Sequence, residues 1–299
     1  MPEYPDVINY VEALSAYAVG HELSRIELLH PFLLRSVSPR PEEVVPGRLG
    51  VVSHMGKRIV LDFGDKGCAV IHLMIAGRLH WREDDKGGRR AKPLARFHFD
   101  NGVLILTEAG TKRRASLHLV NSEDELSQFD RGGLDPLRVS FEEFAARLRS
   151  ENHTLKRALT DQRMLSGIGN AYSDEILLRA GLSPFERTKD LDDDGFRRLH
   201  QATRESLMEW TERIRQDRKG GFPEKVTAFR PEMAVHGRYG KACPVCGTEV
   251  QRIRYAESEC NYCPRCQTGG RVLADRALSR LLKEDWPRRI EDLEEKRRI

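Results

Sequence analysis

LKRALTDQRMLSGIGNAYSDEILLRAGLSP, residues 155–184, is the segment from which the prediction of the fold starts. Apolar residues recur at helical spacing on both sides of its glycine-rich middle, which predicts one helix over 154–165 and a second over 171–182. The same period continues outward and predicts two further helices, over 141–152 and 194–215. This part of the chain is therefore expected to be a helical domain.

The residues before the helical part predict a β-rich domain that begins with one helix. Apolar residues three and four positions apart indicate an amphipathic helix over 5–18. Short strand-like runs follow, and such a series is typical of a β-sandwich or a barrel. The runs cover residues 23–29, 32–37, 48–55, 57–64, 68–75, 95–100 and 103–109. Asn101-Gly102, between the last two, is the strongest hairpin signal, because both positions of such a turn need a positive φ.

Length and composition limit the class of protein. The chain has 299 residues, 39% hydrophobic and 32% charged, which fits about two folded domains and excludes a disordered or low-complexity chain. No run approaches the ~18 apolar residues of a membrane span, and the start MPEYPDVINY lacks the features of a secretion signal. We therefore expect a soluble, cytoplasmic chain. The formal net charge of +4 permits a polyanionic partner without requiring one.

Five of the six cysteines lie close together near the C-terminus. Cys243-x2-Cys246 and Cys263-x2-Cys266 are separated by sixteen residues, the spacing of a four-thiolate zinc site. Four thiolates leave no open coordination position, so one structural Zn²⁺ is predicted. Cys260 also lies three residues before Cys263, and we interpret it as a spare buried thiol.

The N-terminus has the residues for amine chemistry. Removing Met1 would leave Pro2 as a secondary amine, next to the carboxyl of Glu3 and just before a helix. An α-amine has a pKa of about 7.7–8.0, so part of it is neutral and able to attack a carbonyl-like carbon near neutral pH. Taken alone, the same start is better explained as that of an ordinary chain with a stiff first residue.

Three segments together resemble one enzyme family. MPEYPDV at the start, residues 155–184, and HGRYGKACPVCG with YCPRCQ near the end are similar, in order and spacing, to the formamidopyrimidine-DNA glycosylase/endonuclease VIII family. The resemblance spans roughly residues 1–270 and implies an α+β fold. It implies an N-terminal β-sandwich headed by a helix, a helix–two-turn–helix domain and a C-terminal zinc-finger β-hairpin.

The expected domain boundaries follow from this resemblance and from the changes in composition. The β-sandwich is placed at 1–132, the helix–two-turn–helix domain at 133–238, the zinc finger at 239–270 and a helical C-terminal extension at 271–299. Residues 219–242, which span the boundary between the second domain and the zinc finger, are rich in Gly and Pro and are expected to be a mobile loop and linker.

The resemblance also implies a role for individual residues. Pro2 is the expected nucleophile toward C1′ of a damaged nucleoside, Glu3 the acid/base, and Lys57 the lysine that contacts the phosphate beside the lesion. Glycines in the GIG turn let the backbone approach a phosphate. The residues expected to bind DNA are Lys156, Asn170, Tyr172, Arg113 and Ile75.

The implied activity is base-excision repair. The chain is expected to be a bifunctional DNA glycosylase and abasic-site lyase (β/δ-elimination) that acts on oxidised bases in damaged double-stranded DNA. As implied by the family, it would act as a monomer of bacterial type, associated with the nucleoid. A non-catalytic damaged-DNA-binding protein on the same scaffold is the alternative, and a general nucleic-acid-binding protein is a weaker one.

Four residues depart from the family pattern, at three places that are expected to recognise the lesion. Ile75 stands where a Met is expected, Ala115 and Ser116 where an aromatic wedge is expected, and Ser258 where an Arg grips the lesion phosphate. Altered lesion choice is the favoured interpretation, with loss of activity as the other. The sequence leaves open the lesion and the opposite base, although oxidised purines and abasic sites are favoured.

Overall fold

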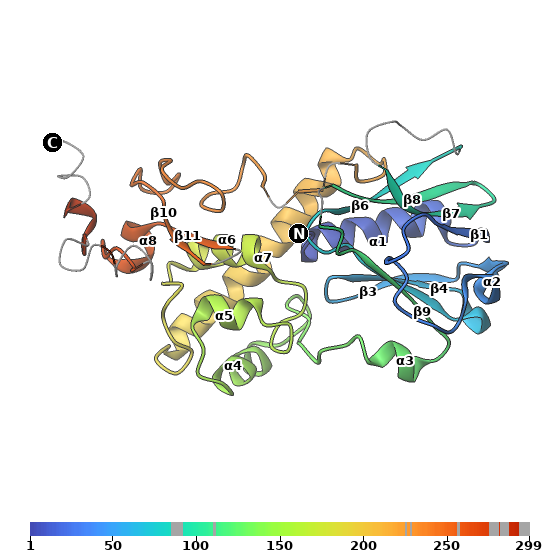
Figure 1. Ribbon diagram of the computed structural model, residues 1–299. Coiled ribbons are helices and arrows are strands. Elements are labelled where there is room, and N and C mark those ends of the chain that lie inside the picture. Colours follow the sequence, from blue (N-terminus) through green and yellow to red (C-terminus); the bar gives the residue numbers. More distant parts are fainter. Residues whose placement is uncertain are drawn as a thin grey trace. The chain divides into compact units, whose positions relative to one another are not determined.

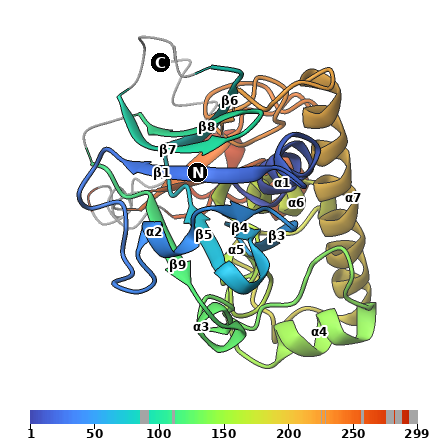
Figure 2. The ribbon, with the colours of Figure 1, turned by 90° about the vertical axis from the view of Figure 1, so that its right-hand side faces the viewer.

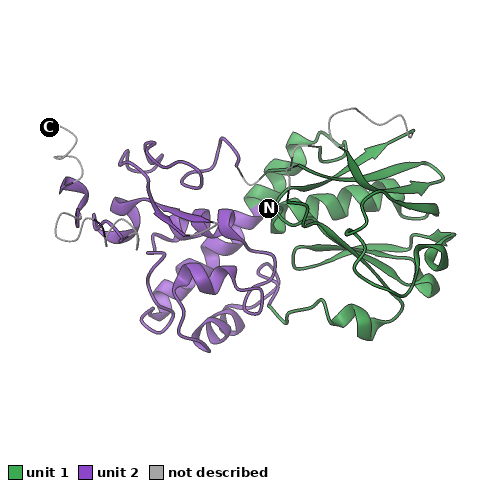
Figure 3. Cartoon of the chain, viewed as in Figure 1, with its two compact units in different colours: residues 1–133, 209–228 green, residues 134–208, 229–299 purple. Residues whose placement is uncertain are grey.

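The computed structural model describes residues 1–84, 92–109, 112–224, 226–227, 229–255, 258–274, 281 and 287–292. Two compact units make up the chain: unit 1 contains residues 1–133 and 209–228, and unit 2 contains residues 134–208 and 229–299 (Figure 3). The finer division into four domains stays a prediction. Within the described residues, no helix combines the length and the apolar character needed to cross a membrane.

Unit 1 is the predicted β-sandwich (Figure 1). Its five-stranded sheet has the order β2-β1-β7-β8-β6, its four-stranded sheet the order β3-β4-β5-β9, and neighbouring strands are antiparallel. The strands are β1 (Glu22–Leu28), β2 (Gly47–Arg48), β3 (Val51–Met55), β4 (Arg58–Asp62), β5 (Cys68–His72), β6 (Gly77–Arg82), β7 (Pro93–Phe99), β8 (Gly102–Glu108) and β9 (Ser116–Val120).

One long helix leads into the sandwich and short helices punctuate its loops. They are α1 (Tyr4–Ala18), α2 (Pro41–Val44), the 3₁₀ turn η1 (Gly64–Lys66) and α3 (Glu123–Ser127). Pro5 lies in the first turn of α1, where its missing N–H costs nothing. One face of α1 joins both sheets in a single core, in which Tyr10, Leu14 and Phe97 are fully buried. Burying each such side chain stabilises the fold by roughly 1.5–3 kcal/mol.

The last residues of α7 (Asp193–Asp217) belong to unit 1 and lie beside α1 (Figure 2). The side-chain amide of Asn9 donates to the carbonyl of Thr211 at 3.0 Å. Glu12 forms ion pairs with Arg215 at 2.6 Å and with Arg218 at 3.0 Å. These contacts tie the helix that carries the N-terminus to a segment about 200 residues later in the chain.

The structure corrects two predictions in the sandwich. The Asn101-Gly102 hairpin is present, but Gly102 pairs with Phe99, so that the loop is Asp100-Asn101 and the positive φ values expected at Asn101 and Gly102 do not occur. The strand predicted over 32–37 is wrong. That segment makes one isolated bridge to β9, and its apolar character comes from Leu33, which fills the core.

Unit 2 contains the predicted helices and a small hairpin. Its elements are α4 (Phe141–Arg149), α5 (Leu155–Thr160), α6 (Asn170–Ala180), the first part of α7, β10 (Gln251–Arg254), β11 (Glu259–Tyr262) and α8 (Pro264–Thr268). β10 and β11 pair antiparallel, as expected of a zinc-finger hairpin. The described residues of 219–242 contain no helix or strand, whereas most of the predicted helical extension lies outside the described residues.

The helix predicted over 154–165 is too long, because α5 ends at Thr160. Side chains take over the hydrogen bonds of the backbone there: Asp161 accepts from the N–H of Arg163 at 2.9 Å, which favours a turn. The helix predicted over 171–182 also ends early, at Ala180, because Gly181 adopts a left-handed conformation that closes α6.

Gly102 is expected to be required for the packing of unit 1. A Cβ there would lie 2.8 Å from the ring of Trp81 and 2.7 Å from the carbonyl oxygen of Arg82. Gly102→Ala should therefore lower the free energy of unfolding by about 1–3 kcal/mol, the usual cost of overpacking. Gly50→Ala is the control, since its Cβ would meet only the Asp62 oxygen at 3.7 Å. Urea unfolding of both variants checks this, and equal losses would contradict it.

Candidate active site and metal centre

The start of α1 buries two carboxylates beside the chain's N-terminus. Glu3 is 2% exposed and Asp6 is fully buried. The carboxylate of Asp6 accepts the backbone N–H of Glu3 at 3.0 Å, which fixes the first residues relative to the helix. A buried carboxyl group at the helix start is thus held next to the amine that the sequence singled out.

Both signs of charge surround this terminus. Burial lowers the pKa of the Met1 amine, the N-terminus of the chain, below its ordinary value; among the nearby charges, Glu3 and Asp6 oppose this shift, and Arg78 and Lys57 reinforce it. The sequence analysis missed Arg78, although its place on β6 among alternating buried positions is a usable signal. The environment favours a neutral, nucleophilic amine.

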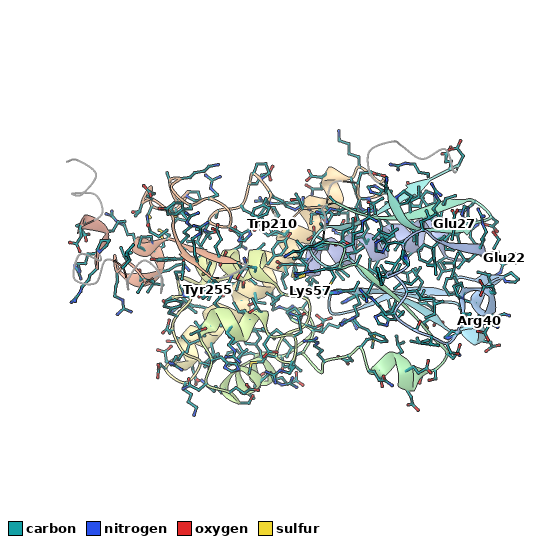
Figure 4. The ribbon with its side chains drawn as sticks, viewed as in Figure 1. Glu22, Glu27, Arg40, Lys57, Trp210 and Tyr255 are labelled. Carbon is teal, nitrogen blue, oxygen red and sulfur yellow. The ribbon has the colours of Figure 1, made fainter. Side chains whose placement is uncertain are left out.

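Lys57, labelled in Figure 4, lies in the turn between β3 and β4. Gly56, before it, has a φ of 60°, which a glycine adopts without strain. Only 9% of Lys57 is exposed. Because the charge of Lys57 acts on the Met1 amine, Lys57 lies at the same end of unit 1 as Pro2 and Glu3. Their catalytic role stays a prediction.

Ile75 and Arg113 both lie in exposed loops of unit 1. Ile75 is at the tip of the tight turn between β5 and β6 and is 55% exposed. Arg113 is exposed in the loop between β8 and β9, which Glu108 braces by accepting the N–H groups of Arg114 and Ala115 at 2.9–3.0 Å. Both side chains are free to enter a distorted duplex, and their predicted contacts stay predictions.

The loop between α5 and α6 is a turn that the side chain of Gln162 holds in one conformation. Gln162 accepts the N–H of Gly167 at 2.9 Å and donates to the carbonyl of Ile168 at 2.7 Å. Gly167 has a φ of 83°, and Asn170 follows as the first residue of α6, with its side-chain amide bound to the carbonyl of Glu259 at 2.8 Å. The turn and the start of α6 offer the positive end of a helix to an anion.

Lys156 and Tyr172 point into unit 2. The Lys156 ammonium donates to Asp174 at 2.5 Å, to the Ser173 hydroxyl at 2.8 Å and to the Asn170 carbonyl at 2.7 Å. Tyr172 is 1% exposed. This geometry favours support of the turn by both residues, whereas the sequence predicted that they contact DNA directly.

Two carboxylates of α6 that the sequence analysis missed organise the same region. Asp174 also binds the imidazole of His236 at 2.8 Å, and Glu175 accepts three consecutive backbone N–H groups, of residues 234–236, at 2.8–2.9 Å. Both acids follow the GIGN motif directly, but only the fold reveals their partners, which lie about 60 residues away.

Four cysteines form the predicted metal centre. The sulfur atoms of Cys243, Cys246, Cys263 and Cys266 all lie within 4.8 Å of one another. Four thiolates around one Zn²⁺ need sulfur atoms about 3.8 Å apart, given Zn–S bonds of about 2.3 Å, so the set fits. These thiolates would hold the ion, which would supply structural stability and take no part in the reaction.

Cys260 is outside this set, as expected. It is fully buried on β11, and burial raises the pKa of its thiol well above the ordinary value. In the same hairpin Arg252 pairs with Glu259 at 3.5 Å and stacks over the ring of Tyr239 at 4.1 Å. Arg252 is therefore engaged within the finger and is a poor substitute for the Arg that Ser258 replaces.

Sequence comparison now places this geometry in a family. Residues 1–114 match the sequence model of the formamidopyrimidine-DNA glycosylase N-terminal domain, and residues 133–218 match that of the formamidopyrimidine-DNA glycosylase H2TH domain. The chain belongs to the formamidopyrimidine-DNA glycosylase family. Members of this family are DNA-binding repair enzymes, and the cluster of four cysteines is consistent with a zinc finger.

Several family members illustrate the likeness. The formamidopyrimidine-DNA glycosylase of Heliobacterium modesticaldum is 32% identical, with 89% of this chain and all of the relative covered. A formamidopyrimidine-DNA glycosylase-like protein of Mycobacterium tuberculosis is 41% identical over 151 residues, which cover 50% of this chain and 94% of the relative. Among solved structures, MutM (Fpg) of Thermus thermophilus has a TM-score of 0.75 at 29% identity, with 89% of this chain and 98% of that chain covered.

A second solved structure contains DNA. It is the Lactococcus lactis formamidopyrimidine-DNA glycosylase bound non-covalently to DNA with an abasic site, with a TM-score of 0.76 at 25% identity. The match covers 89% of this chain and 99% of that chain. Family and fold are thus those of DNA glycosylases whose structures include complexes with damaged DNA.

The metal centre predicts a clean difference between two cysteine variants. Cys263→Ala should lose the metal, because three thiolates bind a structural ion poorly, whereas Cys260→Ala should keep one zinc per chain. Elemental analysis of the purified variants measures this. Zinc lost from Cys260→Ala, or kept by Cys263→Ala, would show that a different set of ligands holds the metal.

Proposed function

We propose that this family member is a bifunctional DNA glycosylase and abasic-site lyase that uses the amine of Pro2, after removal of Met1, as its nucleophile. The observation that carries the proposal is the buried amine of Met1, which lies near the carboxyl groups of Glu3 and Asp6 and the cations Lys57 and Arg78. Pro2 takes over this terminus once Met1 is removed. A merely structural N-terminus gains nothing from burying an amine among four charged groups.

The proposed chemistry begins at C1′ of the damaged nucleoside. The neutral amine of Pro2 attacks C1′, the bond to the base breaks, and the base leaves with the bonding electrons and takes up a proton. Glu3 gives a proton to the ring oxygen as the sugar opens, and Pro2 gives up its own proton to form an iminium. Loss of a C2′ proton then expels the 3′ phosphate, a second elimination expels the 5′ phosphate, and water releases Pro2.

Binding of the strand is assigned to residues of both units. Lys57 is proposed to hold the phosphate beside the lesion, and Asn170 to bind the same phosphate region from the N-terminal end of α6, where helix amides favour an anion. Ile75 and Arg113, both exposed on loops, are proposed to enter the space that the flipped nucleotide leaves. Lys156 and Tyr172 are proposed to support the turn.

Oxidised purines and abasic sites are the proposed substrates, in double-stranded DNA. The relative from Lactococcus lactis was solved with DNA that contains an abasic site. Ala115 is buried in the core of unit 1, so it supplies no wedge beside Arg113. Flipping a nucleotide out of the duplex costs a few kcal/mol, and least at a damaged base pair. A chain that lacks the aromatic wedge is therefore expected to act on pairs that are already weakened.

Borohydride reduction tests the nucleophile. The Met-processed protein should form a covalent adduct with a duplex carrying an abasic site, and tandem mass spectrometry should locate the sugar remnant on Pro2. Glu3→Gln should keep the adduct on a preformed abasic site but lose about 10²–10⁴-fold in base release, because the proton donor is gone. A remnant on a lysine would overturn Pro2 as the nucleophile, whereas tight binding without any adduct would instead favour the non-catalytic damage-binding protein.

The rate of adduct formation should depend on pH through the same amine. Burial lowers the pKa of the Met1 amine at this terminus. We expect the same burial to act on the amine of Pro2 once Met1 is removed, so the rate should rise with pH and level off with a midpoint below the ordinary α-amine range of about 7.7–8.0. The measurement is trapping rate against pH at saturating abasic DNA. A midpoint at or above that range would mean that the buried surroundings do not act on the reacting group.

A further inference from the structure

One face of the four-stranded sheet carries a cluster of basic side chains, Arg58, His72, His118 and Arg131, which we call the arginine–histidine cluster. Arg58 on β4 is the cross-strand partner of His72 on β5. His118 on β9 pairs with Val70, two residues before His72 on the same face of β5. The sheet register therefore places three basic residues side by side.

Phe129, just after α3, organises this cluster. The Arg58 guanidinium stacks over the Phe129 ring, 5.6 Å from its centre, and donates to the Phe129 carbonyl at 3.4 Å. The ring of His118 meets the same phenyl ring edge-on at 4.8 Å. Arg131 follows two residues later and is exposed. Arg58 is thus half-buried and held in one orientation at the start of β4.

The neighbouring charges are nearly all positive. Burial, reinforced by Arg131, lowers the pKa of Arg58. Burial, with the positive charges of Arg58, Lys57, Arg131 and His118, lowers the pKa of His72 to about 4, so His72 is neutral near neutral pH. The cations of the cluster therefore repel one another, and Lys57, the lysine assigned to the lesion phosphate, adds to the positive charge around His72.

Carboxylates near the cluster are engaged elsewhere. Asp62, on the same sheet face, accepts the N–H of Gly64 at 2.8 Å, and Asp130 accepts the N–H of Gly132 at 2.8 Å. Within the described part of the chain, no ion pair joins Arg58 or Arg131 to a carboxylate. A partly buried cation without a counter-charge costs stability, and an anion from outside the chain would offset that cost.

We propose that Arg58 and Arg131 form a second phosphate site, next to Lys57, which binds a neighbouring backbone phosphate of the DNA strand. Arg58 supplies a planar fork that matches a phosphate. The neutral ring of His72 can add an N–H donor, and Arg131 adds charge at the rim. This inference rests on the proposed function, because the occupant is the strand that Lys57 is proposed to hold.

The test is the salt dependence of DNA binding by Arg58→Gln. A duplex with a tetrahydrofuran abasic-site analogue serves as the probe, because it cannot undergo the reaction. Losing one phosphate contact should weaken binding about 5–20-fold at low salt and reduce the slope of log K against log salt by about 0.9. Arg131→Gln should act in the same direction, and Arg58→Lys should restore the slope, because it keeps the charge.

Arg40→Gln is the matched control. It removes the same charge from unit 1, at the end away from Lys57 (Figure 4), and Arg40 is 74% exposed. The slope for Arg40→Gln should equal that of the parent. A slope for Arg58→Gln equal to that of the parent, or the same loss in Arg40→Gln, would overturn the proposal, and thermal unfolding would show whether a variant had merely misfolded.

Single methylphosphonate linkages locate the phosphate. Neutralising one linkage near the lesion should weaken DNA binding by the parent but not by Arg58→Gln. A different linkage should be the one whose neutralisation no longer weakens DNA binding by Lys57→Gln. The proposal would be overturned if no methylphosphonate linkage weakened the parent more than Arg58→Gln. It would also be overturned if Arg58→Gln lost binding of inorganic phosphate but bound DNA as tightly as the parent. Because the analogue needs no Pro2 chemistry, absence of a borohydride adduct would refute the proposed function and leave this site standing.

Discussion

The structure of unit 2 depends on the contacts of one buried carboxylate, that of Asp174. It binds the ammonium of Lys156 from α5 at 2.5 Å, the imidazole of His236 at 2.8 Å and the backbone N–H of Asn261 on β11 at 3.1 Å. Removing one partner from a buried pair costs about 3–5 kcal/mol, because the other charge is left uncompensated. One carboxylate therefore joins the helical turn, the linker and the zinc-finger hairpin.

The same contacts position the anion-binding end of α6. Lys156 reaches past Asp174 to the carbonyl of Asn170, and the side chain of Asn170 binds the carbonyl of Glu259 on the hairpin. Gln162 fixes the turn from its other side. The turn is therefore preorganised, and a phosphate that binds there does not have to order it first.

In unit 1, contacts with α7 and the residues after it hold the N-terminal helix in place. A free N-terminus is normally among the least ordered parts of a protein. Here Asn9 and Glu12 of α1 bind Thr211, Arg215 and Arg218, so the helix that begins at Tyr4 is anchored near its start and along its length. Arg215 in turn lowers the pKa of Glu12, which stays ionised. A reactive amine needs such anchoring to meet one atom of its substrate repeatedly.

What the sequence determined by itself is local: the cysteine spacing, the helical periods, the Gly-rich turn and the Pro2-Glu3 start, each set by residues close together in the chain. It misjudged the end of α5 and the type of hairpin turn at Gly102, and it did not reveal that Lys156 and Tyr172 are buried. It did not reveal the roles of Asp174, Glu175 and Arg78, or the arginine–histidine cluster. Those depend on partners tens to hundreds of residues away, such as His236 for Asp174 and Phe129 for Arg58. Burial and electrostatics act through space, so only the tertiary structure decides which charges meet inside the protein and which remain for DNA.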